Sequence, residues 1–283
     1  MRLVRVGDRG GERPAVLADD GRLLDLGDLL DGGDLDGAFF ASDGISRIRT
    51  AVAEGALPEL DGDGLRIGAP IARPGKVVCI GLNYRDHAEE SGAQVPAEPV
   101  VFMKASNTVV GPFDEVLIPR ASTKTDWEIE LAVIIGRTAR YLESHEAALE
   151  CVAGYAISND VSEREFQLER GGQWDKGKSC ETFNPLGPWL VTADEISDPQ
   201  RLGLRLWVNG QPRQDGDTKN MIFEVAEIVR YLSWFMVLDP GDVVNTGTPA
   251  GVALGGLPYL REGDVMELEI DGLGRQRQTV GQA

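Results

Sequence analysis

The chain has 283 residues, of which 42% are hydrophobic and 26% charged, enough for one large domain or a large domain with a small one. Its formal net charge of −18 argues against nucleic acid or an anionic membrane as a partner, because an acidic surface repels both. Three widely spaced cysteines predict neither a disulfide framework nor a zinc site. Residues 1–7 lack the apolar segment of a signal peptide, and no apolar run approaches the ~18 residues of a membrane helix. We therefore expect a cytoplasmic protein.

Residues 1–70 are predicted to form a small accessory α+β domain with a structural role, because they contain no cluster of chemically useful side chains. The predicted elements are a hairpin (3–6 with 15–17) and two short helices (23–30 and 45–56). The proline-containing segment 70–75 predicts a linker, since proline interrupts both helix and sheet. The catalytic domain is then expected to span residues 71–283.

Residues 71–283 predict a mixed α/β domain that is mainly β. Short apolar strands follow one another with turns about every 8–12 residues, which is typical of an antiparallel or mixed sheet that curls into a barrel. The predicted strands are 76–81, 100–104, 116–119, 126–136, 152–157, 204–208, one within 236–251 and 265–270, and the predicted helices are 143–151 and 222–232. Asn209-Gly210 predicts a hairpin turn. In the second helix, apolar residues at i, i+3, i+4 and i+7 predict the packed face, namely Val225, Ile228, Val229 and Leu232.

Glu128 and Glu130 begin the strand 126–136 and lie on one face of it, about 7 Å apart. Two like charges side by side repel each other unless a cation lies between them. Asp160 follows the apolar run 152–157 and adds a third carboxylate. Such oxygen ligands suit Mg²⁺, or else Mn²⁺ or Ca²⁺. From the spacing alone, the solvated face of an edge strand remains the alternative.

A turn and a helix are predicted after the strand 76–81, and they place His87 and Glu90 one above the other at i and i+3. A carboxylate that binds one imidazole nitrogen leaves the other free to deprotonate water. The alternative is an ordinary solvated helix face, which is how we interpret the second histidine, His145.

A helix that starts near Asp160 would place Asp160, Arg164 and Gln167 on one stripe, where the guanidinium and amide could hold substrate oxygens. A surface Asp–Arg pair is the alternative. The glycine-rich loop 171–180 delivers Lys178, which could stabilise a developing enolate or oxyanion. This loop lacks the residue order of a phosphate-binding loop.

Further along, the Thr248 hydroxyl and backbone amides freed by Gly247 and Gly251 could cap an anionic group, although a tight turn would need the same residues. Lys104 could reach an anionic ligand, but a lysine at the end of a strand is more often solvated. The loops near Pro96, 171–174 and 254–259 are expected to carry specificity, with Trp174 and Tyr259 contacting either substrate or core.

Together these segments resemble the fumarylacetoacetate hydrolase family over residues 77 to 274. The residues that carry the likeness are Gly81-Leu82-Asn83-Tyr84-Arg85-Asp86-His87, Glu128-Ile129-Glu130-Leu131-Ala132, Asn159-Asp160-Val161-Ser162-Glu163-Arg164, Gly177-Lys178-Ser179 and Thr246-Gly247-Thr248-Pro249. The N-terminal region is similar to that of a bacterial branch with diketo-acid hydrolases, ureidoglycolate lyase-like proteins and 2-hydroxyhepta-2,4-diene-1,7-dioate isomerases. Ala105 departs from the Lys-Pro pair common in relatives.

The resemblance implies a β-roll of mixed sheets, usually a homodimer, with Mg²⁺ or Mn²⁺ held by Glu128, Glu130 and Asp160. It also implies a His87–Glu90 dyad on a segment that closes over ligand. Residues at family positions that hold or polarise the substrate are Arg164, Gln167, Lys178 and Thr248.

Three functional hypotheses follow. The first is hydrolysis of a C–C bond in a 2,4-dioxo acid through a metal-bound enolate, with His87, oriented by Glu90, activating water and Lys178 supporting the oxyanion. The second reprotonates the same enolate and gives an isomerase, tautomerase or decarboxylase of an oxaloacetate-like 2-oxo acid. The third is a non-catalytic binding protein on this fold.

Overall fold

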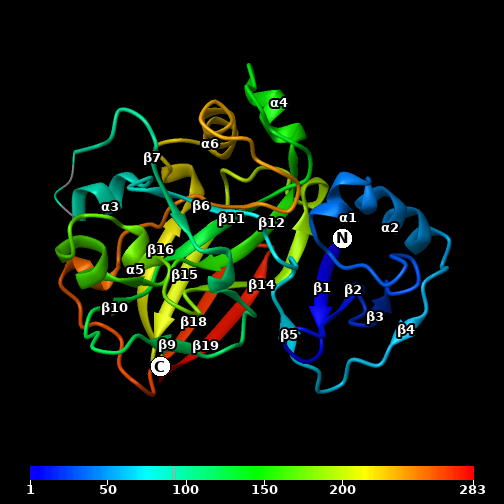
Figure 1. Ribbon diagram of the computed structural model, residues 1–283, viewed down its shortest axis with the longest axis horizontal. Helices are drawn as coiled ribbons and strands as arrows, with labels where there is room; N and C mark the ends of the chain where they lie inside the picture. The colour runs from blue at the N-terminus through cyan, green and yellow to red at the C-terminus, as the bar shows by residue number, and fades with distance from the viewer. Residues whose placement is uncertain (91, 93) are drawn as a thin grey trace.

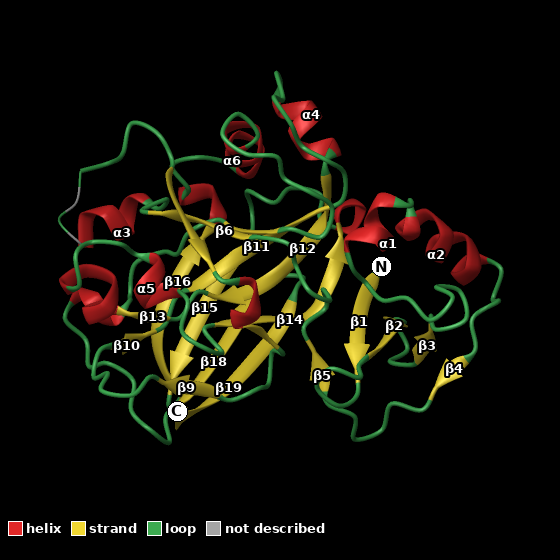
Figure 2. Cartoon of the chain, viewed as in Figure 1, coloured by secondary structure: helices red, strands yellow, loops and turns green. Residues whose placement is uncertain are grey.

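A computed structural model describes residues 1–90, 92 and 94–283, and its helices are short. The α-helices are α1 (Gly37–Ala41), α2 (Gly44–Ala53), α3 (Arg85–Glu90), α4 (His145–Glu150), α5 (Asp175–Lys178) and α6 (Val225–Leu232), with a π-helix at Glu165–Glu169. The 3-10 helices are Ser106–Thr108, Ala193–Glu195, Thr218–Asn220 and Ala253–Gly255. Figure 2 shows α3 and α5 on the left of the strands, α6 and α4 above them, and α1 and α2 beside the N-terminal strands. Among the described residues, none of the helices combines the length and apolar character needed to cross a bilayer.

Strands dominate the architecture. In the first half of the chain the strands are β1 (Arg2–Val6), β2 (Arg13–Leu17), β3 (Leu23–Asp25), β4 (Glu59–Leu60), β5 (Ile67–Gly68), β6 (Val77–Gly81), β7 (Val100–Lys104), β8 (Val109–Val110), β9 (Val116–Ile118) and β10 (Thr125–Asp126). The others are β11 (Ile129–Ile135), β12 (Val152–Asn159), β13 (Ser162–Glu163), β14 (Asn184–Thr192), β15 (Gly203–Val208), β16 (Gln211–Asp217), β17 (Val243–Asn245), β18 (Val265–Ile270) and β19 (Gly274–Gln282).

In the described part of the chain, these strands form a large mixed sheet, a smaller second sheet and the two-stranded pair β10-β13 (Figure 1). The large sheet runs β4-β3-β2-β1-β14-β12-β11-β17-β6-β7, and β17 pairs with β6 in parallel while its other neighbour β11 is antiparallel. The second sheet runs β16-β15-β18-β19-β9. The main core contains side chains of both sheets, such as Leu131 and Ile157 from the first and Leu204 and Leu268 from the second. The predicted mixed, mainly β fold is confirmed.

The N-terminal region joins the large sheet directly. Strand β1 pairs with β14 through Leu3 and Leu190, and α1 and α2 lie beside it (Figure 1). The predicted helix over 23–30 is wrong: β3 pairs with β2, and the Asp25 carboxylate then accepts a hydrogen bond from the Gly27 amide at 2.9 Å to start a turn. The predicted helix over 45–56 corresponds to α2.

The segment that we predicted as a linker, 70–75, is partly buried, because Ile71 and Ala72 are only 2% and 6% exposed. A boundary near residue 70 stays a prediction.

Most predicted elements of residues 71–283 are present. The Asn209-Gly210 turn has the two positive φ angles, 53° and 72°, that a tight hairpin requires. The four residues predicted to form the packed face of the helix over 222–232 are all buried: Val225, Ile228, Val229 and Leu232.

Two local predictions are wrong. No α-helix starts at Asp160; the chain makes the strand β13 first, because Ser162 and Glu163 pair with β10, and a π-helix follows. The stretch 171–180 is not entirely a loop, since α5 occupies its second half and Lys178 is the last residue of that helix.

Candidate metal centre

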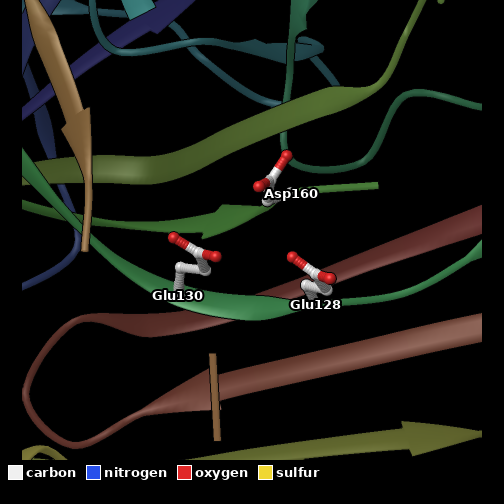
Figure 3. A group of neighbouring side chains, drawn as sticks. All are labelled: Glu128, Glu130 and Asp160. Atoms are coloured by element: carbon white, nitrogen blue, oxygen red, sulfur yellow. The ribbon is translucent and has the colours of Figure 1, made fainter. Parts of the chain in front are cut away.

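The register between β11 and β12 brings three carboxylates together. Ile129 pairs with Asn159, so Glu128 lies opposite Asp160, and the Asp160 amide donates to the Glu128 carbonyl at 2.9 Å. Because side chains alternate along a strand, Glu130 points to the same face as both. The carboxylates of Glu128, Glu130 and Asp160 offer oxygen atoms that all lie within 4.8 Å of one another, and Figure 3 shows them facing a shared space.

This cluster is buried and crowded with negative charge. Glu130 and Asp160 are 1% and 0% exposed. Burial, then the charges of Asp160 and Glu128, raise the pKa of Glu130 well above its usual value of 4.5. For Glu128, burial acts in the same direction, but the charges of Lys178 and Arg164 outweigh it and lower its pKa to about 2. A buried group of acids in which one resists ionisation is chemically suited to a hard cation.

Positive side chains alternate with these carboxylates. Lys178 Nζ lies 2.7 Å from both Glu128 and Asp160. Lys104 donates to Asp160 and, at 3.0 Å, to the Val161 carbonyl. We call this arrangement the ion-pair row; in order, its members are Asp126, Arg164, Glu128, Lys178, Asp160 and Lys104.

The charges of this region fit a divalent cation. The ion-pair row holds three carboxylates and three cations, so its charges cancel when all are ionised, and Glu130 beside it adds a negative charge. The Gly247 amide donates to Glu130 at 2.7 Å but supplies only a partial positive charge. A metal ion would allow Glu130 to ionise, which burial otherwise opposes. The residues of this site therefore fit a divalent metal ion.

Arg164 is fully engaged by its neighbours. Its Nε donates to Asp126 at 2.7 Å, its Nη2 to Glu128 at 2.6 Å and its Nη1 to Gln167 at 3.0 Å. Arg164 and Gln167 thus meet as the sequence predicted, but through the turn from β13 into the π-helix. Asp126 also accepts from the amides of Ala253 and Leu254, so it ties the 3-10 helix at 253–255 to the site.

His87 and Glu90 lie on α3, as predicted. The Glu90 carboxylate is 3.6 Å from His87 Nδ1, longer than a hydrogen bond. It accepts instead from the Gly251 amide, at 3.0 and 3.1 Å to its two oxygens. The two side chains are therefore close to each other but form no hydrogen bond with each other in this structure.

Thr248 is held by the scaffold. Its hydroxyl donates to the Ile129 carbonyl at 2.8 Å and accepts from Gln214 at 2.8 Å. The amides of Gly247 and Gly251 do cap anionic groups, but these are carboxylates of the protein itself, Glu130 and Glu90.

One cavity of about 130 Å³ lies at this site, and its lining has two chemically different parts. The buried part is polar and consists of His87, Glu128, Glu130, Arg164, Gln167, Lys178 and Thr248. The remaining lining is mainly apolar and consists of Ile80, Gly81, Leu82, Phe102, Leu168, Trp174 and Leu254. Tyr259, the second aromatic residue that we considered for substrate contact, lines a different depression, near Ser122.

Sequence reasoning missed two members of the ion-pair row. Lys104 is 2% exposed, so the solvated position that we favoured for it is wrong; its alternation with the buried Phe102 on β7 does carry the signal. Asp126 is two residues before Glu128 and on the same face, so the pattern D-x-E-x-E could have identified it.

Comparisons with known proteins agree with this geometry. The family model described as fumarylacetoacetate (FAA) hydrolase, C-terminal, matches residues 76–281. A protein of Burkholderia ambifaria that carries only the general name hydrolase is 50% identical over 286 residues, covering 100% of both chains.

Two solved structures represent different activities. Maleylpyruvate hydrolase from Sphingobium sp. SYK-6, in complex with manganese(II) and pyruvate, is 29% identical with a TM-score of 0.82, and the match covers 100% of both chains. 5-Carboxymethyl-2-hydroxymuconate delta-isomerase from Mycobacterium smegmatis is 31% identical with a TM-score of 0.79, over 100% of this chain and 99% of that one.

Proposed function

Because this chain belongs to the fumarylacetoacetate hydrolase family, we propose that it is a divalent-metal-dependent hydrolase that cleaves a C–C bond in a 2,4-dioxo acid of the acylpyruvate type. The observation that carries the proposal is the buried group of Glu128, Glu130 and Asp160, with His87 on the wall of the cavity that Glu128 and Glu130 also line. Water adds to the C4 carbonyl, the C3–C4 bond breaks, and the products are a carboxylic acid and a 2-oxo acid.

Glu128, Glu130 and Asp160 would hold the ion, for which we propose Mg²⁺ or Mn²⁺. When bound, the ion supplies Lewis-acid polarisation of the 2-oxo carboxylate head. Support for manganese comes from the related maleylpyruvate hydrolase, which is in complex with that ion.

Lys178, Arg164, Gln167 and Thr248 are proposed to bind the substrate head. Lys178 is buried and its pKa is raised above the usual range by Asp160 and Glu128, which outweigh burial, so it stays cationic and can stabilise oxyanion charge. Arg164 and Gln167 are positioned by one another, and the Thr248 hydroxyl is fixed between Ile129 and Gln214.

His87 is proposed to take the proton of the attacking water. A rotation of the Glu90 side chain away from the Gly251 amide would bring its carboxylate to Nδ1 of His87, which is now 3.6 Å away. Nε2 would then serve as the base, and closure of α3 over the ligand would exclude stray water.

The direct test is turnover of 2,4-dioxopentanoate, followed by loss of its enol absorbance and by identification of acetate and pyruvate. We expect activity with Mg²⁺ or Mn²⁺, loss with a chelator and recovery when the ion is restored. Failure of every member of a 2,4-dioxo acid panel to release pyruvate and the corresponding carboxylic acid would refute the proposal.

An isomerase, tautomerase or decarboxylase remains the second candidate. It is supported by the likeness to the delta-isomerase and by the open His87–Glu90 pair, because enolate stabilisation needs the buried cations but not an activated water. Oxaloacetate turnover that survives His87→Ala, without any dioxo-acid hydrolysis, would favour it. A non-catalytic binding protein, the third candidate, would bind 2-oxo acids without any turnover.

We further propose a cytoplasmic homodimer in which residues 1–70 are an accessory domain. Sedimentation equilibrium of the full chain tests the oligomeric state.

A further inference from the structure

Two leucines of the apolar lining are exposed, whereas the polar part of the cavity is buried. Leu168 and Leu254 are 43% and 39% exposed, whereas Lys178 and Arg164 are 2% and 3% exposed. A ligand whose charged head lies among the buried polar groups therefore directs its other end past the two leucines. An apolar lining with a few polar groups is the usual composition of a small-molecule site.

The wall beside these leucines is aromatic and fixed in place. The rings of Trp174 and Phe102 meet edge to face with their centroids 5.3 Å apart. Trp174 lies against Gly81, where an added Cβ would come within 2.6 Å of its ring. Lys178 Nζ lies 4.9 Å from the centroid of the Phe102 ring, so this wall continues directly into the polar part.

The cations of the cavity are committed to its buried part. Among the described lining residues, the permanently charged cations are Arg164 and Lys178, and every nitrogen of Arg164 donates to Asp126, Glu128 or Gln167. The lining around Leu168, Leu254 and Trp174 contains no lysine or arginine in the part of the chain that the structure describes. A second carboxylate on the substrate would lose water there without gaining a partner, which is unfavourable.

We propose that this site takes monocarboxylic acids whose far end is short, uncharged and apolar, and that Trp174, Leu168 and Leu254 select it. The inference rests on the proposed function, because it takes the 2-oxo acid head as the group held by the buried polar residues. The cavity volume of about 130 Å³ is well below the ~300–1,000 Å³ of pockets for drug-sized ligands, so the tail is a few carbons long. The site is thereby distinguished from one for dicarboxylic acids.

Matched pairs of acids test the proposal. The turnover pair is 2,4-dioxoheptanoate and 2,4-dioxoheptanedioate, which differ only in whether the chain ends in a methyl group or a carboxylate. We expect kcat/KM to favour the methyl-terminated acid by about tenfold or more. Equal values, or a preference for the diacid, would overturn the inference.

A binding pair separates this inference from the proposed function. 2-Oxohexanoate and 2-oxohexanedioate lack the C4 carbonyl and cannot be hydrolysed, and their affinities are measured by calorimetry with Mn²⁺ present. Tighter binding of 2-oxohexanoate supports the inference even if no dioxo acid is cleaved, in which case only the proposed hydrolysis fails. Failure of both acids to bind, or tighter binding of the diacid, overturns the inference.

A variant pair locates the selectivity. Leu168→Arg places a cation at the exposed side of the cavity and is expected to shift the kcat/KM and affinity ratios toward the diacids by about tenfold. Leu149→Arg is the matched control, because Leu149 is 42% exposed on α4 and does not line this cavity. An unchanged ratio in Leu168→Arg, or an equal shift in the control, would refute the assignment of these residues.

Discussion

Glu130 is the carboxylate of the site whose surroundings least favour its charge. Its raised pKa means that the metal-free folded state retains a proton at pH values where the unfolded state has lost it. The folding stability that this group contributes is therefore complete below pH 4.5 and decreases as the pH rises from there toward the folded-state pKa.

Metal affinity should increase over that same pH range, by up to about tenfold per pH unit, because the ion must displace the proton of Glu130. Calorimetric titration of Mn²⁺ in buffers of different ionisation enthalpy measures both the affinity and the released proton. In Glu130→Gln the proton release should disappear and the affinity fall, while the metal-free variant stays at least as stable as the parent. An affinity independent of pH above 4.5 would contradict the role of this residue.

His87 provides a second prediction at the scale of single residues. His87→Ala should lower kcat for hydrolysis by about 10²–10⁴-fold, the usual contribution of a general base, while leaving Mn²⁺ affinity unchanged. The matched control is His145→Ala, because that exposed histidine bonds Glu227 at 2.8 Å and is not among the residues that line the cavity. Comparable losses in the two variants would show that His87 is not the base.

Individual site residues were predictable where strand alternation alone decides the outcome. Glu128 and Glu130 share a face because they are two residues apart on an extended chain, and Asp160 joins them through the register of an antiparallel pair. Alternation with the buried Phe102 indicates the face on which Lys104 lies, but the ion pair of Lys104 was not predictable in the same way. It depends on Asp160, which is 56 residues away, and the sequence of β7 alone does not show that contact.

At the scale of elements, the Glu90 carboxylate joins α3 to the loop after β17. Glu90 accepts from the Gly251 amide, and Gly251 has a φ of 105° and lies against the Arg213 carbonyl so closely that a Cβ would overlap it. Its replacement must shift this loop.

Gly251→Ala should therefore destabilise the protein by about 1–3 kcal/mol and speed hydrogen exchange of the α3 amides. Thermal unfolding and exchange measured by mass spectrometry test the two effects. Gly11→Ala serves as control, since its added Cβ would meet only the Asp8 carbonyl, at 3.8 Å. Unchanged exchange in α3 would mean that Glu90 does not anchor the helix.

Elements were predictable to the extent that their periodicity is local. β18 alternates half-buried and buried positions along its length, and α6 buries one face, as their sequences indicate. The π-helix after Arg164 was not predictable, because its start depends on Glu163, whose carboxylate accepts from the Phe166 amide at 2.7 Å and from Ser122 on a distant loop. An α-helix with Asp160, Arg164 and Gln167 on one face, which we expected, is equally compatible with the spacing of these residues.

At the scale of the whole molecule, the N-terminal region covers part of the central sheet. β1 lies along β14, and Leu3 and Phe39 share one core cluster with Leu186 and Leu190. This pairing joins residues 187 positions apart, as Leu3 and Leu190 show, and no local pattern in the sequence encodes it. The order of strands in the large sheet was therefore beyond prediction from periodicity.

A fragment of residues 71–283 should consequently aggregate or lose cooperative unfolding, because it exposes the edge of β14 and the leucines beneath it. Size-exclusion chromatography and thermal unfolding of the fragment, compared with the full chain, test this expectation. A soluble fragment that melts cooperatively and binds Mn²⁺ would show that residues 1–70 are dispensable.

The ion-pair row also constrains how this protein can diversify. Each interior member neutralises two neighbours, so replacing one alone strands a buried charge on either side, at a cost of about 3–5 kcal/mol. Substitutions there are tolerable only as coordinated sets, whereas Leu168 and Leu254 can be exchanged singly. Proteins that evolve from this sequence would thus keep the residues that bind the substrate head and would vary in the substrate tails that they accept.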